Sequence, residues 1–315
     1  MIVVLSGGVG AARFLLGLSE TVAPSSITAI VNTGDDLEWN TLHVSPDIDT
    51  VTYTLARANA ETGWGLEGES WSVIDALGRY GASTWFGIGD RDLATHLYRT
   101  EGLSGGRTLS EVTRAITAAW GVEVAIVPMT DDRVRTKLIV DGDEEIDFQE
   151  YFVHRHHEVA VSSVRFEGIE EALPAPGVLQ TLEEAEAIII APSNPIVSIG
   201  PILAFPGIAE VLHRRRDRVA AISPIIGGRA LKGPADRLLR ELGHESSATG
   251  VARLLTDCCA TMIIDDEDQA EAETIRRLGY AVVVTNTVMT ETAARTELAL
   301  TTLRALGIGN DQGER

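Results

Sequence analysis

The chain opens with IVVLSGGVGAAR at residues 2–13, and this stretch decides the fold. Residues 2–5 form an apolar, β-branched run that ends at a glycine turn, and residues 11–20 then show helical spacing of their apolar side chains. A second apolar run follows at residues 27–31, so the chain begins as a β-α-β unit. Because these runs are apolar throughout, without alternation, they are typical of strands in a parallel sheet that helices cover on both faces.

The same alternation of strand and helix returns in the second half of the chain. Four more apolar runs are separated by helical segments, and they lie at residues 187–191, 219–222, 261–264 and 281–284. We therefore predict an α/β fold with a Rossmann-like, doubly wound parallel sheet of about six strands.

Residues 41–180 break this rhythm. They are rich in tryptophan and include an expected hairpin that turns at residues 141–143. Histidines at 154, 156 and 157 look like metal ligands, but we interpret them as part of an exposed strand, which would point them to opposite faces. We predict that 41–180 is a large insertion forming a lid or acceptor-binding region, and that residues 1–40 and 181–315 form a nucleotide-binding core.

The composition excludes several classes of function. The chain has 315 residues, with 46 acidic against 26 basic side chains and a net charge of −20, which argues against binding to nucleic acid or to an anionic membrane. No apolar run reaches the roughly 18 residues of a membrane span. The two cysteines, Cys258 and Cys259, are adjacent, so we expect no disulfide framework and a cytoplasmic location. An anionic substrate would need a local positive group or a divalent cation.

The glycine turn is a candidate phosphate site. Glycines at 7, 8 and 10 would let backbone amides approach a phosphate at a helix N-terminus. Arg13 stands where the dinucleotide fingerprint has its third glycine, and the Lys-Ser/Thr ending of a Walker loop is missing. A tight turn without a ligand is the alternative.

Two acidic segments follow the second strand. NTGDD at residues 32–36 lies at the carboxyl edge of the sheet, where doubly wound folds bind ligands, and DIDT follows at residues 47–50. This spacing favours a carboxylate cluster that holds Mg²⁺. Capping of the following helix is the alternative role for Asp49.

Three further segments carry groups suited to ligand binding. In WFGIGDRD at residues 85–92, Trp85 and Phe86 are suited to stacking on a planar ring with the cation of Arg91 beside them, although a core aromatic pair with a surface ion pair is the alternative. The loop at residues 191–201 supplies neutral polar groups, and the loop at 225–234 supplies basic ones. Both follow strands, which favours binding of a nucleobase or phosphate, with structural turns as the alternative.

Together these segments resemble one family: the 2-phospho-L-lactate transferases of coenzyme F420 biosynthesis and their phosphoenolpyruvate transferase relatives in bacteria. The matching blocks run in family order at residues 7–14, 32–36, 46–50, 63–65, 85–95, 148–150 and 191–195. The resemblance implies a Rossmann-like core, Mg²⁺ dependence and a homodimer. It also implies transfer of a three-carbon phosphoester from a guanosine-diphosphate-linked donor to the deazaflavin Fo, with release of GMP. Asp49 and Arg91 match the Fo-binding pair of the family.

The resemblance and the residues lead to one set of expected roles. Asp36 and Asp49 would hold Mg²⁺ and act in catalysis, and Trp85 would join Asp49 and Arg91 around Fo. The guanosine diphosphate moiety would contact Gly7, Gly8, Gly10, Arg13, Ser193, Asn194, Ser198 and Arg229.

Two other functions and two donors remain open at this point. A nicotinamide-dependent oxidoreductase and a sugar-nucleotide-binding regulatory protein on the same core are the alternative functions. The donor is either enolpyruvyl- or lactyl-diphospho-guanosine, giving dehydro-F420-0 or F420-0. The preference for arginine over lysine and the abundant alanine are typical of GC-rich bacteria, which favours phosphoenolpyruvate as the transferred group.

Overall fold

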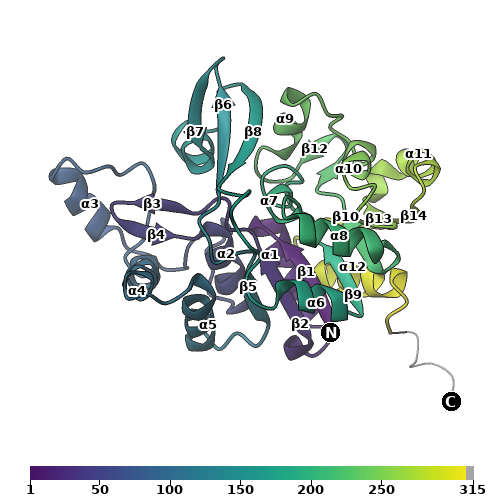
Figure 1. The fold of residues 1–315 in the computed structure, drawn as a ribbon, viewed down its shortest axis with the longest axis horizontal. Coiled ribbons are helices and arrows are strands. Elements are labelled where there is room, and N and C mark those ends of the chain that lie inside the picture. Colours follow the sequence, from purple (N-terminus) through teal and green to yellow (C-terminus); the bar gives the residue numbers. More distant parts are fainter. Residues whose placement is uncertain (310–315) are drawn as a thin grey trace.

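A parallel sheet of seven strands is the centre of this computed structural model, which describes residues 1–309. Its strands are β1 (Ile2–Ser6), β2 (Ile27–Val31), β5 (Ala125–Pro128), β9 (Ala187–Ile190), β10 (Val219–Ile222), β13 (Thr261–Ile264) and β14 (Ala281–Val284). Their order across the sheet is β14-β13-β10-β9-β1-β2-β5, which is the doubly wound arrangement (Figure 1). The predicted fold class and all six predicted strands are confirmed.

The seventh strand was not predicted. β5 is a short run of Ala-Ile-Val-Pro that pairs in parallel with β2, with Ala125 opposite Thr28. It lies at the edge of the sheet, where a strand of four residues that ends in proline needs no partner on its outer side. Part of the 41–180 segment therefore belongs to the central sheet, whereas the division of the chain into core and insertion stays a prediction.

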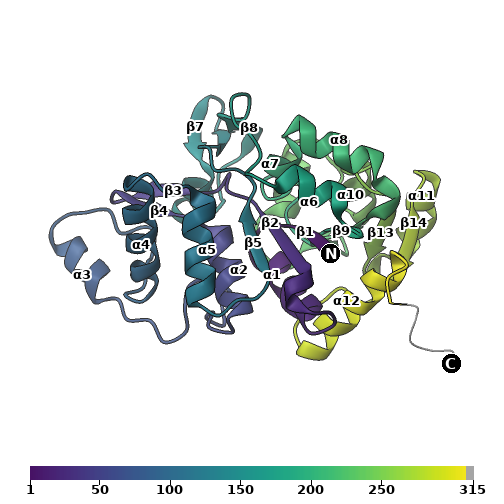
Figure 2. The same cartoon turned by 60° about the horizontal axis from the view of Figure 1, so that its bottom comes forward.

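Helices cover both faces of the sheet, as Figures 1 and 2 show. Side chains from alternate positions of β1 enter two separate cores: Val3 and Leu5 pack on one face, and Ile2 and Val4 on the other. The second face is covered by α1 (Gly8–Ser19), α2 (Pro46–Leu55), α5 (Leu109–Ala119) and α12 (Thr292–Ala305). The first face is covered by α6 (Val178–Glu184), α8 (Pro206–Arg214), α10 (Ala248–Leu254) and α11 (Ala272–Arg277), with α7 (Gly200–Leu203) and α9 (Ala235–Glu241) nearby.

Most of the remaining elements project from the β2–β5 side of the sheet (Figure 1). One group comprises the hairpin of β3 (Leu37–Trp39) and β4 (Leu42–Val44) with α3 (Ser72–Arg79) and α4 (Asp92–Ser104). The other is an antiparallel sheet of β6 (Arg135–Val140), β7 (Glu144–Asp147) and β8 (Val161–Glu167), whose β6–β7 turn confirms the predicted hairpin. The short hairpin of β11 (Ile225–Ile226) and β12 (Arg229–Ala230) follows β10.

The exposed strand predicted around residues 154–158 is wrong. The structure has a π-helix at Glu150–His154 and then a turn. His156 and His157 have φ angles of 50° and 46°, which a strand does not allow. The guanidinium of Arg155 bonds both Glu144 and Glu150 and so fastens the turn to β7.

No helix within residues 1–309 is long and apolar enough to cross a membrane.

Candidate active site

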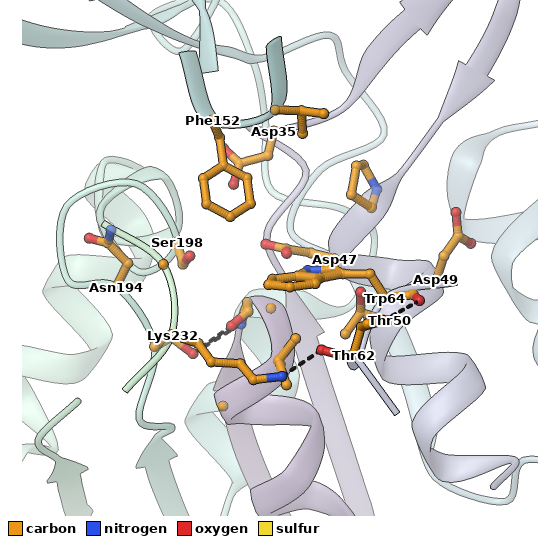
Figure 3. Close-up of a pocket in the computed structure, with 18 of the residues that line it drawn as sticks. Asp35, Asp47, Asp49, Thr50, Thr62, Trp64, Phe152, Asn194, Ser198 and Lys232 are labelled. Atoms are coloured by element: carbon orange, nitrogen blue, oxygen red, sulfur yellow. Dashed lines mark hydrogen bonds between the residues drawn. The ribbon is translucent and has the colours of Figure 1, made fainter. Parts of the chain in front are cut away.

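A pocket of about 760 Å³ lies at the carboxyl edge of the central sheet. Its floor is the turn between β1 and α1, and the loops after β9 and β10 form one wall. The opposite wall comes from residues 44–96 and 148–156, so segments far apart in the sequence meet here (Figure 3). A volume of this size is typical of a site for a nucleotide-sized ligand.

The glycine turn forms the floor as predicted. Gly8 has a φ of +67°, a conformation that favours glycine. A Cβ atom on Gly10 would collide with the carbonyl oxygen of Pro192, so only glycine lets α1 lie this close to the loop after β9. Gly7 has no side chain to cap α1, but the Gly8 amide hydrogen-bonds the carboxylate of Asp47, and residues 7–10 all line the pocket.

The loop after β9 lies directly against this turn. The Ser193 hydroxyl donates to the Gly7 carbonyl at 2.8 Å and accepts from the Gly7 amide at 3.3 Å. Asn194 uses its Oδ1 to accept from the Ile196 amide at 2.9 Å, while its buried Nδ2 has no partner among the described residues. Ser198 also lines the pocket, and Figure 3 shows it beside Asn194. This wall therefore offers an unused donor to a ligand.

Of the two basic residues predicted to contact the donor, one lines the pocket and the other does not. Arg13 lines the pocket. Arg229 lies in β12, is exposed, and is not among the described residues that line the pocket. Lys232, three residues further on, lines it instead.

The four aspartates after β2 have different surroundings. Asp47 lines the pocket and accepts from Asn32 Nδ2 at 2.9 Å; burial raises its pKa to about 7 against this hydrogen bond, and the charge of Asp36 adds to the rise. Burial and the nearby Asp47 charge also raise the pKa of Asp35 well above its usual range. Asp36 is directed away from the lining, because its Oδ2 accepts from Ser45 Oγ at 2.8 Å and lies 3.0 Å from His43 Nε2.

Asp35 and Asp47 are the pair that fits a hard cation. Both line the pocket, they repel each other, and Asp35 Oδ1 is buried without a partner among the described residues. A bound Mg²⁺ needs one or two carboxylates and completes its shell with water and phosphate oxygens. Residues 1–309 contain no cluster of three or more His, Cys, Asp or Glu arranged for a metal, so substrate oxygens would have to supply ligands. Of the predicted ligands, Asp49 is paired with Arg99, and Asp36 does not line the pocket although its Oδ1 is buried without a partner among the described residues.

Asp49 lies in α2 and forms a buried ion pair with Arg99 of α4. The Arg99 guanidinium is fully buried and contacts both carboxylate oxygens, one of them at 3.1 Å. The N-cap of α2 is Ser45, and the carboxylate of Asp49 makes no capping bond, so capping is not its role. Asp49 also lines the pocket, where Arg99 holds it in one orientation.

The ion pair continues into a polar network between α2 and α4. His96 Nδ1 lies 3.7 Å from Asp49 and its Nε2 lies 3.2 Å from Asp92. The Tyr53 hydroxyl donates to Asp92 at 2.7 Å. Although burial opposes it, the hydrogen bond and charge of His96 hold the pKa of Asp92 below its usual range. Sequence analysis missed Arg99 and His96; the recurrence of polar residues at 92, 95, 96 and 99 on one helix face was the available signal.

The aromatic wall differs from the prediction. Trp85 packs edge-on against Phe86 and His154, with ring centroids 5.7 and 5.2 Å apart, and joins a small core that includes Trp39 and Ile88. Phe86 does line the pocket, but Trp85 and Arg91 are not among the described lining residues. The other aromatic residues of the wall are Tyr53, Trp64, Trp71, Phe148 and Phe152.

Arg91 lies at the outer rim of this wall. Its amide donates to Glu69 Oε2 at 2.7 Å, and its guanidinium bonds the Glu67 carbonyl. Asp90 accepts from the amides of Ser72 and Val73 and so caps α3. Asp90 therefore fixes the start of α3, Asp92 belongs to the buried network with Tyr53 and His96, and Arg91 braces the loop that carries Glu69 into the pocket.

Fold and pocket together define a doubly wound α/β protein with a ligand site across the carboxyl edge of its sheet. The chain belongs to the 2-phospho-L-lactate transferase CofD family, whose model matches residues 2–303, and this is a family of transferases.

Curated relatives agree with this assignment, and a solved structure shares the fold. The chain is 42% identical over 309 residues to a phosphoenolpyruvate transferase of Kitasatospora aureofaciens, covering 96% of each chain. It is 43% identical to the protein of that name from Streptomyces griseus, covering 95% of this chain and 96% of the relative. A crystal structure of a UPF0052 family member from Bacillus halodurans matches with a TM-score of 0.65 at 16% identity, covering 95% of this chain and 98% of the other, which shows a shared fold.

Proposed function

We propose that this protein transfers a phosphoenolpyruvyl group from enolpyruvyl-diphospho-guanosine to the deazaflavin Fo, giving dehydro-F420-0 and GMP. Family membership supports the transferase class, and the names of the relatives at 42–43% identity support phosphoenolpyruvate over 2-phospho-L-lactate as the transferred group. The lactyl donor, which would give F420-0, differs by a tetrahedral carbon in place of a flat one. The substrates are small molecules, and the homodimer stays a prediction.

The donor occupies the glycine-turn side of the pocket in this proposal. The N-terminus of α1 and the unused Nδ2 of Asn194 attract phosphate or guanine oxygens, and Arg13 adds positive charge. Gly10 and Pro192 keep the helix and the loop close enough for both to contact one ligand.

The acceptor occupies the opposite wall. The deazaflavin ring system is planar and packs on aromatic side chains such as Trp64 and Phe86. Asp49, oriented by Arg99, accepts a hydrogen bond from a ribityl hydroxyl of Fo. Arg91 acts by bracing the loop at the rim.

The reaction forms one P–O bond and breaks another. The hydroxyl oxygen of Fo bonds to the phosphorus that carries the three-carbon acid, while the bridging oxygen leaves with the electron pair on GMP and the hydroxyl proton passes to solvent. Such a transfer depends on positioning and charge neutralisation more than on covalent chemistry. The protein supplies the positioning through α1, the loop after β9 and Asp49.

Magnesium fits at Asp35 and Asp47, where two buried carboxylates lack a counter-charge from a basic side chain. When bound, the ion would neutralise the diphosphate of the donor. Asp36, predicted as a ligand, acts on this site through its charge, which raises the pKa of Asp47 alongside burial.

The observation that carries the proposal is the pairing of two unlike walls around one pocket. A glycine turn at the N-terminus of α1 lines one side, and a carboxylate that a buried arginine orients lines the other beside aromatic side chains. This geometry suits an anionic donor on one side and a planar polyhydroxylated acceptor on the other.

Competition between the two guanylylated donors tests the proposal. Protein, Mg²⁺ and Fo are incubated with both donors, and the products are separated by mass. We expect dehydro-F420-0 to dominate, although a pocket discriminates such small differences by only about 1–3 kcal/mol. A tenfold preference for the lactyl donor would reverse the choice of donor, and the absence of both products would reject the transferase reaction itself. Full turnover in excess chelator would reject Mg²⁺.

A further inference from the structure

Two basic side chains of the pocket, Arg13 and Lys232, have no carboxylate partner. Among the described residues that line the pocket, Arg13 is the arginine and Lys232 is the lysine. The lining also includes the carboxylates of Asp35, Asp47 and Asp49. No ion pair joins either cation to an acid within residues 1–309, although the chain has 46 acidic residues. Positive charge without a carboxylate partner therefore lies along an otherwise acidic pocket, with Lys232 exposed at its rim.

The other lysine of the chain shows the ordinary arrangement. Lys137 lies on β6, with its Nζ 2.7 Å from Asp147 and 3.8 Å from Glu167. Lys232, in contrast, has its pKa lowered by partial burial and by the positive charge of Arg13, which places the two cations within electrostatic reach of each other. Two like charges close together favour an anion between them.

Neutral groups hold Lys232 at the rim of the pocket. Its Nζ donates to the carbonyl oxygen of Thr62 and lies 5.2 Å from the centroid of the Trp64 ring, as Figure 3 shows for the Thr62 bond. Trp64 in turn contacts Phe152 edge-on, with centroids 5.9 Å apart. A carbonyl and an aromatic face neutralise an ammonium far less than a carboxylate does.

The segment that carries these neutral groups lies against α1. A Cβ atom on Gly63 would meet the Val9 side chain at 2.8 Å and Lys232 Nζ at 3.5 Å. Val9 lies in the first turn of α1 and lines the pocket. The 62–64 segment thus lies between Lys232 and the floor of the pocket.

We propose that Arg13 and Lys232 form a subsite for an oxyanionic group of the donor, and that Lys232 couples the binding of this group to the Thr62–Trp64 segment. The inference rests on the proposed function, because the donor carries two such groups: the diphosphate of its nucleotide half and the carboxylate of its three-carbon acid. The sequence indicated the basic loop at residues 225–234 as a nucleobase or phosphate site with Arg229 as its site residue, and the residue of that loop that contributes a cation to the pocket lining is Lys232.

Calorimetric titration of the full chain tests this subsite. The ligands are GDP, inorganic pyrophosphate and phosphoenolpyruvate, each added to wild type, Lys232→Met, Lys232→Arg and Arg13→Met. Lys137→Met is the matched control, since it removes the other lysine, which lies outside the pocket lining. We expect Lys232→Met and Arg13→Met to weaken anion binding on the order of tenfold, Lys232→Arg to retain most of it, and Lys137→Met to match wild type.

The pattern among ligands identifies the source of the anion. Weaker binding of both GDP and pyrophosphate assigns the subsite to the diphosphate, and a loss confined to phosphoenolpyruvate assigns it to the three-carbon acid. A change in tryptophan fluorescence on anion binding that is absent in Lys232→Met supports the coupling. Loss of this change in Trp64→Phe identifies Trp64 as the source of the signal.

Two results would overturn the subsite. One is wild-type protein that binds none of the three anions, and the other is Lys232→Met and Arg13→Met with unchanged affinities for all of them. If the proposed function is wrong but the subsite is right, the result is different: no GMP forms from Fo and the donor, while pyrophosphate binding still depends on Lys232.

Discussion

Replacing Arg99 with methionine is the most demanding test of how the site is built. Arg99 is fully buried and Asp49 is 5% exposed, and the guanidinium contacts both oxygens of the carboxylate. Methionine keeps most of the aliphatic volume but removes the charge, so Asp49 is left buried without its partner. Breaking a buried ion pair in this way costs about 3–5 kcal/mol of unfolding free energy. His96, whose Nδ1 is 3.7 Å from Asp49, replaces the charge of Arg99 only in part. We therefore expect the free energy of unfolding to fall by about 3 kcal/mol.

Urea denaturation with linear extrapolation measures this loss. Arg155→Met is the control, because Arg155 lies at the surface turn with its partners Glu144 and Glu150, and its loss should cost at most about 1 kcal/mol. In a double-mutant cycle, Asp49→Asn combined with Arg99→Met should be less destabilising than the sum of the single changes, with a coupling of about 1–3 kcal/mol. An Arg99→Met protein as stable as the Arg155→Met control would refute the assignment of Arg99 as the group that holds Asp49.

Three further outcomes are expected. Gly10→Val should lose about 1–3 kcal/mol of stability and most GDP affinity, both measured on one preparation, because its side chain would collide with the Pro192 carbonyl; wild-type GDP binding would contradict the close approach. In metal-free protein, Asp47 has a pKa of about 7 in the folded state and near 3.8 in the unfolded state, so the folded state holds the proton more tightly. The free energy of unfolding therefore falls as the pH rises from about 4 to about 7. Asp47→Asn should flatten that fall, and an unchanged pH profile would show that Asp47 is ionised throughout. Arg91→Ala should weaken Fo binding in a fluorescence titration while GDP binding stays near wild type; equal loss of both ligands would indicate a collapsed loop.

The strands were predictable because burial on both faces demands uninterrupted apolar runs. β1, β9 and β10 each read as such a run, and each is buried along its whole length. β5 was not predicted because an edge strand needs only partial burial, and its four residues include an exposed alanine. The histidine-rich turn was misread as a strand because alternation alone does not reveal the bonds from Arg155 that fasten it.

The site was predictable where it depends on local backbone chemistry. The glycine turn and the loop after β9 both end buried strands of one sheet, so their meeting follows from topology. Arg99 was not predictable from spacing, since its partner Asp49 lies 50 residues away and the pairing depends on how α4 packs beside α2. For the same reason Trp64 and Phe152, rather than Trp85, face the pocket: the insertion decides which aromatic side chains turn inward.

The most direct test of the account is the stoichiometry of both products in one reaction. Wild-type protein is mixed with Mg²⁺, Fo and enolpyruvyl-diphospho-guanosine, and GMP and the modified deazaflavin are quantified by mass spectrometry. The account predicts one GMP for each dehydro-F420-0 formed, with both products falling together in Asp49→Asn. Unmodified Fo and intact donor after prolonged incubation, with both ligands bound, would contradict it.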